Sequence, residues 1–371
     1  MTNLFNNICD FLDAVEEIYP IPSHTDLLKT WEEDVREYWF DCLGSEGASL
    51  QEQQMFESII SFRKAFHAEA LYKEAETIPE GNTWQWLLTT TQVEQRTDAW
   101  YREKENLLTA SEIAQVWSGP LTRARLIKSK VPKEVYNPIT PRLAVPRSIQ
   151  TAMDWGVRYE PVVKGILEKQ LKLKINDLGR IPHKTIQNLA ASPDGLITDG
   201  PEELVGRLIE IKCPTSRKIK NDEVPFEYWA QMQIQLEVCD LEACEFVEVK
   251  FAEVEDTSEE AEGWIGLEQK GELGEYRYQY SDTPITEGPR AESPLTQASE
   301  GWNLIETYGW KLVELRRVTQ HRDRNWFAGI QKDLQAFWDD VKGAREGTWI
   351  PPPPRVKKAV KCAIVDEATE S

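Results

Sequence analysis

The stretch from Ser192-Pro193-Asp194-Gly195 to Glu210-Ile211-Lys212 decides the fold, because it sets two acids and one lysine on adjoining short strands. Residues 208–213 alternate, so a strand period of two places Glu210 and Lys212 on one face and turns Ile209 and Ile211 toward a core. Asp194 lies in a Pro-Asp-Gly turn, at the end of a strand predicted over 188–192. Such a group of side chains can hold a divalent cation. The pattern is typical of metal-assisted hydrolysis, whose usual substrates are phosphodiesters.

Each part of this pattern also has an ordinary structural explanation. An Asp in a Pro-x-Gly turn is common turn chemistry, and a Glu-x-Lys strand is often a solvated face of cross-strand charge pairs. The two motifs occur together, in this order and at this spacing, and the combination favours the metal site.

Length and composition bound the class of protein. The 371 residues suffice for one large domain or for two to three small ones. The sequence has neither an apolar run of transmembrane length nor a charged-then-apolar amino-terminal signal, so we expect a soluble, intracellular protein. Its six cysteines are scattered without a Cys-x-x-Cys pair, which argues against a disulfide framework and against a structural zinc site.

The formal net charge of −20 argues against nucleic acid binding, but the charges are unevenly distributed. Residues 1–95 carry 5 Lys and Arg against 18 Asp and Glu, a net of −13, and residues 236–371 carry 16 against 28, a net of −12. Residues 96–235 carry 22 against 17, a net of +5. A basic groove inside an acidic shell would bind a polyanion locally. The alternative is that this uneven charge distribution is a fluctuation of the kind that any polar chain shows.

The predicted elements form a mixed sheet with helices on its faces, preceded by helices within residues 1–78. Further helices are expected over 153–173, 226–238 and 323–344, and strands over 178–181, 188–192, 204–213, 243–251 and 302–320. Residues 252–301 are rich in Glu, Gly, Ser, Thr and Pro, which predicts a long loop insertion. We therefore divide the chain into an acidic helical accessory region (1–94), a main domain (95–345) and a Pro-rich flexible tail (346–371).

Two segments ahead of the first long helix of the main domain are suited to contact an anion. Thr109-Ala110-Ser111-Glu112 is typical of a helix start, where hydroxyl groups and free N–H groups bind anions. Residues 121–147 carry seven basic side chains against one acid, together with four prolines. We predict a basic, partly irregular loop that follows DNA, with a solvated charge run as the alternative.

Five blocks of sequence point to one family. They are Trp100 with Thr109-Ala110-Ser111, Trp155-Gly156-x-x-Tyr159-Glu160, Ser192-Pro193-Asp194-Gly195, Glu210-Ile211-Lys212-Cys213-Pro214 and Ala230-Gln231-Met232-Gln233. In this order they resemble the lambda-exonuclease-like (YqaJ-type) viral recombinase nucleases of the restriction-endonuclease-like superfamily. Arg322-Asp323-x-x-Trp326-Phe327 is similar to the ending of members from large DNA viruses. The resemblance implies an α/β (α+β) fold with a restriction-endonuclease-like mixed β-sheet core flanked by helices, and it omits residues 1–90 and 252–301.

The resemblance also implies roles for particular side chains. At the metal centre, Mg²⁺ or Mn²⁺ would be held by Asp194, Glu210, the carbonyl of Ile211 and, in completing the acidic cluster, Glu160. Lys212 would orient the attacking water and help to deprotonate it, and Gln233 would steady the site. A 5′-phosphate would bind Thr109, Ser111 and Lys104, with a second basic contact from Arg123, Arg125 or Lys128. Lys104 stands where the family usually has an arginine, which weakens bidentate phosphate recognition.

The function implied is a metal-dependent DNA exonuclease that works from duplex ends, 5′ to 3′, in viral recombination, repair or genome processing. Partners implied are double-stranded DNA ends, a single-strand annealing protein and further copies of the chain in a ring trimer, with no membrane. The expected location is the host cytoplasm or nucleus, or the virion. Two alternatives stay open: a structure-specific endonuclease or resolvase on the same fold, and a non-catalytic DNA-binding or virion protein.

Overall fold

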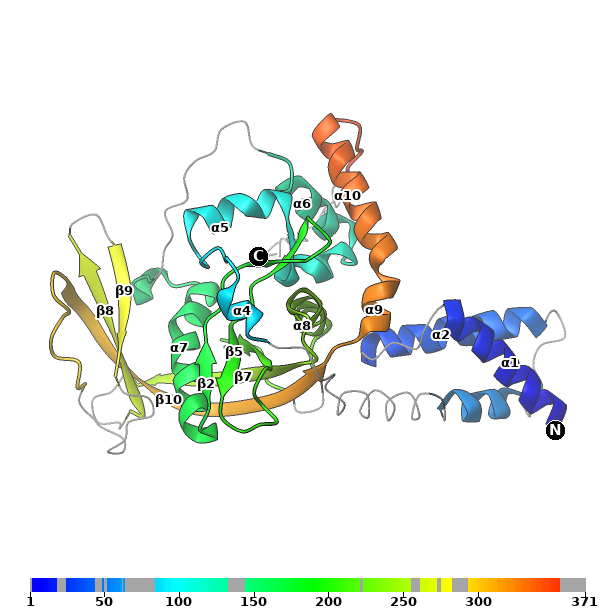
Figure 1. Cartoon of the computed structure of the whole chain (residues 1–371), viewed down its shortest axis with the longest axis horizontal. Coiled ribbons are helices and arrows are strands. Elements are labelled where there is room, and N and C mark those ends of the chain that lie inside the picture. Colours follow the sequence, from blue (N-terminus) through cyan, green and yellow to red (C-terminus); the bar gives the residue numbers. More distant parts are fainter. Residues whose placement is uncertain are drawn as a thin grey trace, which may run out of the picture.

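The computed structural model describes residues 2–18, 25–43, 49, 52–61, 63, 84–132, 144–220, 223–254, 261–271, 275–281 and 293–353. Helices α1 (Thr2–Ile18) and α2 (Thr25–Leu43) lie at one end of the molecule, and strands β8 (Gly263–Lys270) and β9 (Glu275–Tyr280) lie at the other (Figure 1). Within the described segments, no helix combines the length and the apolar character that a membrane span requires.

A seven-stranded mixed sheet forms the centre of the fold, in the order β2-β5-β6-β7-β10-β8-β9. Its remaining strands are β2 (Lys174–Asn176), β5 (Gly195–Asp199), β6 (Leu208–Lys212), β7 (Ala243–Val254) and β10 (Asn303–His321). The pair β6–β7 is parallel and the other pairs are antiparallel. Register shifts at Ile305 and Val313 mark bulges in β10, which pairs with β7 along one part and with β8 along the other. Since a bulge bends a strand, the two bulges account for the curl of β10 in Figure 1.

A second, three-stranded sheet connects the amino-terminal part of the main domain to this centre. Its order is β1 (Leu108–Thr109), β4 (Leu189–Ala191) and β3 (Ile181–Pro182), with β1 parallel to β4. The register sets Thr109 beside Ala190. Because β4 leads directly into Asp194, this sheet brings the Thr109 segment close to the Pro-Asp-Gly turn.

Two helices cover opposite faces of the central sheet. Helix α7 (Ala152–Leu171) packs on Ile209 and Ile211 of β6, and α8 (Phe226–Cys239) packs on the face that carries Leu208. The alternation predicted for β6 is therefore confirmed, although both of its faces are buried. Helix α7 begins at a capping box in which Asp154 accepts from the backbone N–H and the hydroxyl of Thr151, and it ends at Lys172 in the left-handed conformation.

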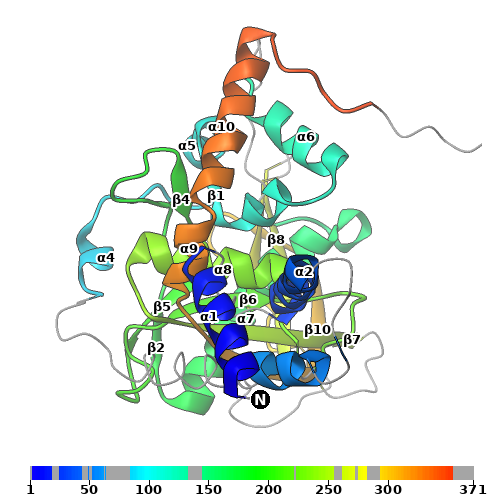
Figure 2. The same ribbon diagram turned by 90° about the vertical axis from the view of Figure 1, so that its right-hand side faces the viewer.

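The other helical segments precede α7 or follow β10 in the chain. They are α4 (Trp86–Thr89), α5 (Asp98–Glu103), η2 (Lys104–Asn106), η3 (Ala110–Val116), α6 (Pro120–Ser129), η4 (Arg147–Ile149), α9 (Arg324–Gly329) and α10 (Gln331–Glu346). Helix α10 passes beside α6, as both views show (Figures 1 and 2). Residues 52–61 are also helical and share a core with α1 and α2 that is separate from the cores around α7 and α8. The division of the chain into three regions remains a prediction.

Three sequence-based predictions need correction. Residues 252–301 are not simply a loop, since they contain β8 and β9. The polar composition around the alternating Glu275–Tyr280 segment hides its strand pattern. The helix expected over 323–344 is two helices that meet at Ile330. The predicted irregular basic segment starts as helix α6, for which Pro120 supplies the first residue. Residues 133–143 of that segment and most of the tail lie outside the described residues.

Candidate active site

Asp194 and Glu210 meet where β5 and β6 pair. Gly195 lies opposite Ile209, so the side chain of Asp194 reaches the backbone of β6. Its Oδ2 atom accepts a hydrogen bond from the Ile211 backbone N–H at 2.7 Å. The structure thus brings the turn acid and the acid-x-Lys strand together, as their spacing predicted.

Glu210 is buried, with 1% of its surface exposed, and both of its carboxylate oxygens accept hydrogen bonds. Oε1 accepts from Gln231 Nε2 at 2.7 Å and from the ammonium group of Lys212, and Oε2 accepts from Gln235 Nε2 at 2.6 Å. A buried carboxylate needs such donors to offset the loss of hydration. Glu210 is therefore held in one orientation before any ligand arrives.

Gln233, the residue expected to steady the site, faces away from it. Its Nε2 donates to the His321 carbonyl at 2.7 Å, and its Oε1 accepts from the Asp323 backbone N–H at 2.6 Å. On a helix, residues two apart project in widely different directions, whereas Gln231 and Gln235, four apart, share one face. The glutamines that contact Glu210 are therefore Gln231 and Gln235, and Gln233 secures the junction between β10 and α9.

Lys212 keeps its proton in this setting. Burial lowers the pKa of its ammonium group, but Glu210 and Asp194 outweigh burial and raise the pKa well above the ordinary lysine value. The ammonium group also lies 5.0 Å from the centre of the Tyr228 ring. The ammonium group places positive charge and hydrogen-bond donors beside Glu210 and Asp194, and the expected role of Lys212 toward an attacking water stays a prediction.

Glu160 comes from α7, which crosses the opposite face of the sheet. Its Oε2 accepts from Arg96 at 2.5 Å, and its Oε1 accepts from Lys164 at 2.8 Å. Lys164 also contacts Asp177 at 2.7 Å. Burial raises the pKa of Glu160, but Lys164 and Arg96 outweigh it, so the pKa lies below the ordinary value and the carboxylate is ionised.

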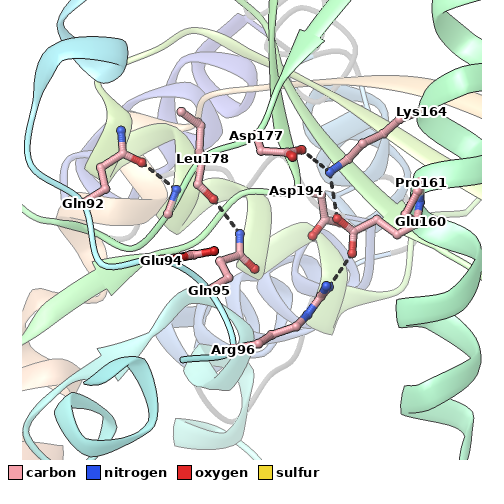
Figure 3. A pocket seen from close by; sticks show the side chains of 11 residues that line it. Gln92, Glu94, Gln95, Arg96, Glu160, Pro161, Lys164, Asp177, Leu178 and Asp194 are labelled. Carbon is pink, nitrogen blue, oxygen red and sulfur yellow. Dashed lines mark hydrogen bonds and ion pairs between the residues drawn. The ribbon is translucent and has the colours of Figure 1, made fainter. Parts of the chain in front are cut away.

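A cavity of about 500 Å³ opens beside these side chains. Figure 3 shows Glu160 and Asp194 pointing toward one another, with Arg96 and Lys164 on either side of Glu160. The cavity is further lined by the segment 92–95 and by residues 177–179. Asp194 and Glu160 both line it.

The electrostatics of Asp194 show an excess of negative charge. Burial, then Glu210 and Glu160, raise its pKa well above the ordinary aspartate value, and Lys212 and the Ile211 N–H offset only part of this effect. A divalent cation would neutralise that charge, and carboxylate oxygens are the donors that Mg²⁺ and Mn²⁺ prefer. The chemistry of Asp194 and Glu210 therefore fits a cation. Among the described residues, however, no three acidic, histidine or cysteine side chains are arranged as a ready metal site.

The predicted phosphate pocket is built around Glu112, the first acid of η3. Glu112 Oε2 accepts from the Thr109 hydroxyl at 2.8 Å, and the Ser111 hydroxyl lies 3.4 Å from that of Thr109. Lys104 forms an ion pair with the other oxygen of Glu112 at 3.1 Å. Thr109, Ser111 and Lys104 are thus brought together, as predicted.

Two further cations of this pocket were missed in the sequence. Lys130 has 1% of its side chain exposed and donates to Glu112 at 2.8 Å and to the Lys104 carbonyl at 3.0 Å. Arg180, 2% exposed, stacks on the Trp100 ring at 4.4 Å. Its Nε and Nη2 atoms are buried without a hydrogen-bond partner among the described residues. Arg180 directly precedes β3 and its backbone pairs with Val93, so long-range pairing brings it here and no spacing rule would have found it.

The basic residues proposed for a second phosphate contact separate into two groups. Arg123 forms an ion pair with Asp340 at 2.5 Å and lies 5.9 Å from the centre of the Phe337 ring. It therefore joins α6 to α10. Arg125 and Lys128 are exposed on α6. Lys130 and Arg180 are the further cations that lie beside Glu112, and a second basic contact to a phosphate stays a prediction.

Comparison with known proteins supports the resemblance found in the sequence. Residues 99–242 match the family of the YqaJ-like viral recombinase domain. An uncharacterized protein of Acanthamoeba polyphaga mimivirus, a large DNA virus, is 28% identical over 215 residues, which cover 53% of this chain. This chain thus matches 36% of the length of that relative.

Solved structures of exonucleases are also similar in part. An alkaline exonuclease from Laribacter hongkongensis is 21% identical, with a TM-score of 0.40 over 68% of this chain and 95% of that one. A phage-related exonuclease from Haemophilus somnus is 12% identical, with a TM-score of 0.34 over 69% of this chain and 97% of that one. The α+β fold itself, a curled mixed sheet flanked by helices, follows from the topology described above.

Proposed function

We propose that this chain, whose residues 99–242 match the YqaJ-like viral recombinase domain, is a DNA nuclease that uses Mg²⁺ or Mn²⁺ and digests duplex DNA from its ends. One observation carries the proposal: the group Asp194, Glu210 and Lys212 adjoins a pocket of hydroxyls and cations. The Trp100 ring nitrogen donates to the Ser192 hydroxyl at 3.2 Å, and Ser192 is two residues before Asp194. A terminal phosphate in the pocket would thus lie next to the acidic centre.

The acidic centre supports hydrolysis of a phosphodiester. Asp194, Glu210 and the Ile211 carbonyl would hold the cation, which supplies charge neutralisation at the phosphate. Gln231 and Gln235 keep Glu210 oriented toward the strand pair. The ammonium group of Lys212 donates hydrogen bonds and stabilises negative charge that develops on an attacking oxygen. Side chains fixed in advance in this way lower the barrier more than mobile ones do.

The pocket supports cutting from an end. Lys104 and Lys130 pair with the buried carboxylate of Glu112, and Arg180, which pairs with Glu103 at 3.4 Å, lies close enough for Glu112 to act on its charge. Burial lowers the pKa of Lys130, and Glu112 offsets only part of that effect, while Lys104 and Arg180 lower it further. A phosphate dianion would neutralise the excess positive charge and would pair with the free nitrogens of Arg180. Arg180 would restore the guanidinium that the lysine at position 104 lacks.

The direction of digestion, the biological role and the partners rest on the resemblance. We propose 5′ to 3′ digestion, in DNA recombination or genome processing of a large DNA virus. A single-strand annealing protein and a ring of identical subunits are proposed partners.

The test is a comparison of three substrates: linear duplex DNA with 5′-phosphates, the same DNA after dephosphorylation, and closed circular DNA. We expect rapid digestion of the first in Mg²⁺, slower digestion of the second, no cutting of the circle and no activity in EDTA. Preferred cutting of circular or branched DNA would favour the endonuclease alternative. Activity that survives EDTA or Asp194→Asn would contradict the proposed centre.

A further inference from the structure

Both carboxylate oxygens of Glu160 are already engaged by cations of this chain. Arg96 binds Oε2 at 2.5 Å, and Lys164 binds Oε1 at 2.8 Å. The side chains of Glu160 and Lys164 are 16% and 15% exposed, so water screens these ion pairs only partly. A metal ion at Glu160 would therefore lie directly beside two positive charges of the chain itself, which disfavours its binding there.

The backbone fixes Arg96 in this position. Its φ angle is 66°, in the left-handed region that non-glycine residues rarely adopt. The other two non-glycine residues with positive φ in the described chain, Lys172 and Asp240, are ordinary helix C-caps, whereas Arg96 is not. The neighbouring Gln95 side chain donates to the carbonyls of Leu178 and Pro193 at 2.8 and 3.1 Å. Arg96 is thus tied to the turn that carries Asp194, and its guanidinium lines the cavity.

The formal charges of the centre show what these cations do. Three carboxylates, Glu160, Asp194 and Glu210, stand beside three cations, Arg96, Lys164 and Lys212, so the side chains sum to zero. This sum leaves out Glu94 and Asp177, which are exposed to water, although Asp177 also contacts Lys164 at 2.7 Å. One divalent cation and one phosphodiester would leave a single positive charge, whereas two divalent cations would leave three. Arg96 and Lys164 together carry the same charge as one divalent cation.

Building on the metal-dependent function proposed above, we propose that Glu160 is a positioning residue for Arg96 and Lys164 and not a metal ligand. These two side chains then take the place of a second divalent cation beside Asp194. The centre binds one cation, at Asp194 and Glu210, and Arg96 meets the phosphate from the cavity side. If Glu160 no longer positions Arg96, the contact of Arg96 with the phosphate would weaken, and the metal ion at Asp194 and Glu210 would stay bound.

The test is the number of Mn²⁺ ions bound per chain, measured from the electron paramagnetic resonance signal of free Mn²⁺ in a titration without DNA. Wild type should bind one ion, and Glu160→Gln should also bind one, with an affinity reduced by no more than about 10-fold, as for a group outside the ligand set. Asp194→Asn should bind none. The double variant R96Q/K164Q, which frees Glu160, should bind two. Arg102→Gln, on the exposed surface of α5, is the matched control and should keep the count at one.

The outcomes separate this inference from the proposed function. Two ions in wild type, or loss of an ion in Glu160→Gln, would overturn the inference even if DNA digestion still requires Asp194. If a folded R96Q/K164Q variant binds only one Mn²⁺ ion, the proposal that Arg96 and Lys164 take the place of a second metal ion is overturned. A wild-type chain that binds no Mn²⁺ and cuts no DNA would overturn the proposed function and this inference together. If R96Q/K164Q fails to fold by circular dichroism, the wild-type and Glu160→Gln counts decide.

Discussion

The backbone N–H of Ile211 donates a hydrogen bond to Asp194 Oδ2 at 2.7 Å, so the two halves of the acidic motif are joined through the main chain. This bond fixes Asp194 beside Glu210 although both side chains are acidic. Burial and the two neighbouring carboxylates raise the pKa of Asp194 well above its ordinary value, which means that the fold disfavours the ionised form. Because the fold holds Asp194 beside two other carboxylates, a bound cation would relieve the repulsion among them.

Asp194→Asn should therefore abolish DNA digestion and also stabilise the fold. An acid whose folded pKa is raised favours folding at pH below its unfolded pKa, about 3.9. This contribution is lost as the pH rises toward the folded value. In EDTA, the melting temperature of the variant should exceed that of wild type by a margin that begins near pH 4 and grows with pH. Thermal unfolding from acid to alkaline pH checks this, and a margin that shrinks with pH would contradict it.

The three glutamines of α8 should have different effects. Gln231→Ala and Gln235→Ala remove donors to Glu210, so each should weaken Mn²⁺ binding by about 10- to 100-fold. Gln233→Ala removes bonds to His321 and Asp323, so it should lower the melting temperature and leave Mn²⁺ affinity nearly unchanged. Calorimetric titration and thermal unfolding of the three variants check this. Loss of Mn²⁺ affinity only in Gln233→Ala would refute the corrected assignment.

Glu112 and Lys130 form a buried ion pair beneath the phosphate pocket. Burial raises the pKa of Glu112, but Lys130 and Lys104 outweigh it, so its pKa lies below the ordinary value. Its stabilising contribution is present above the unfolded pKa of about 4.3 and is lost as the pH falls through the folded value. Glu112→Gln should thus cost about 3–5 kcal/mol of unfolding free energy at neutral pH and much less in acid.

The double variant E112Q/K130M should recover most of this loss, because no buried charge is then left unpaired. Urea unfolding of both variants at neutral and acid pH measures the difference. A double variant as unstable as the single one would show that the pair is not the cause.

The basic side chains of α6 should separate into DNA contacts and a structural contact. Arg125 and Lys128 are exposed, so replacing either by alanine should lower the slope of log K against log salt for DNA binding by about 1. Arg123→Ala breaks the contact to Asp340 and Phe337 and should lower the melting temperature while the salt slope stays unchanged. Fluorescence anisotropy at several salt concentrations decides. An equal slope change in all three variants would contradict the separation.

Local sequence patterns predicted the parts of the site that depend on short-range geometry. The alternation around Glu210, the bend at Asp194 ahead of β5 and the capping box at Thr109 each follow from a few neighbouring residues, and all occur in the structure. The choice among Gln231, Gln233 and Gln235 depends on the rotation of α8 about its axis, which packing on both sides of the helix sets. Arg96, Lys130 and Arg180 are brought in from distant segments by sheet pairing and buried ion pairs. The polar composition around β8 and β9 likewise hid strands that pair with β10.

The most direct test of the central claim follows two labels on one duplex: a 5′-terminal phosphate label and a label at the 3′ end. In Mg²⁺, wild type should release the 5′ label at once as a mononucleotide and the 3′ label only late, and Asp194→Asn should release neither. Simultaneous release of both labels, early internal fragments, or equal release by Asp194→Asn would contradict an end-directed nuclease centred on Asp194 and Glu210.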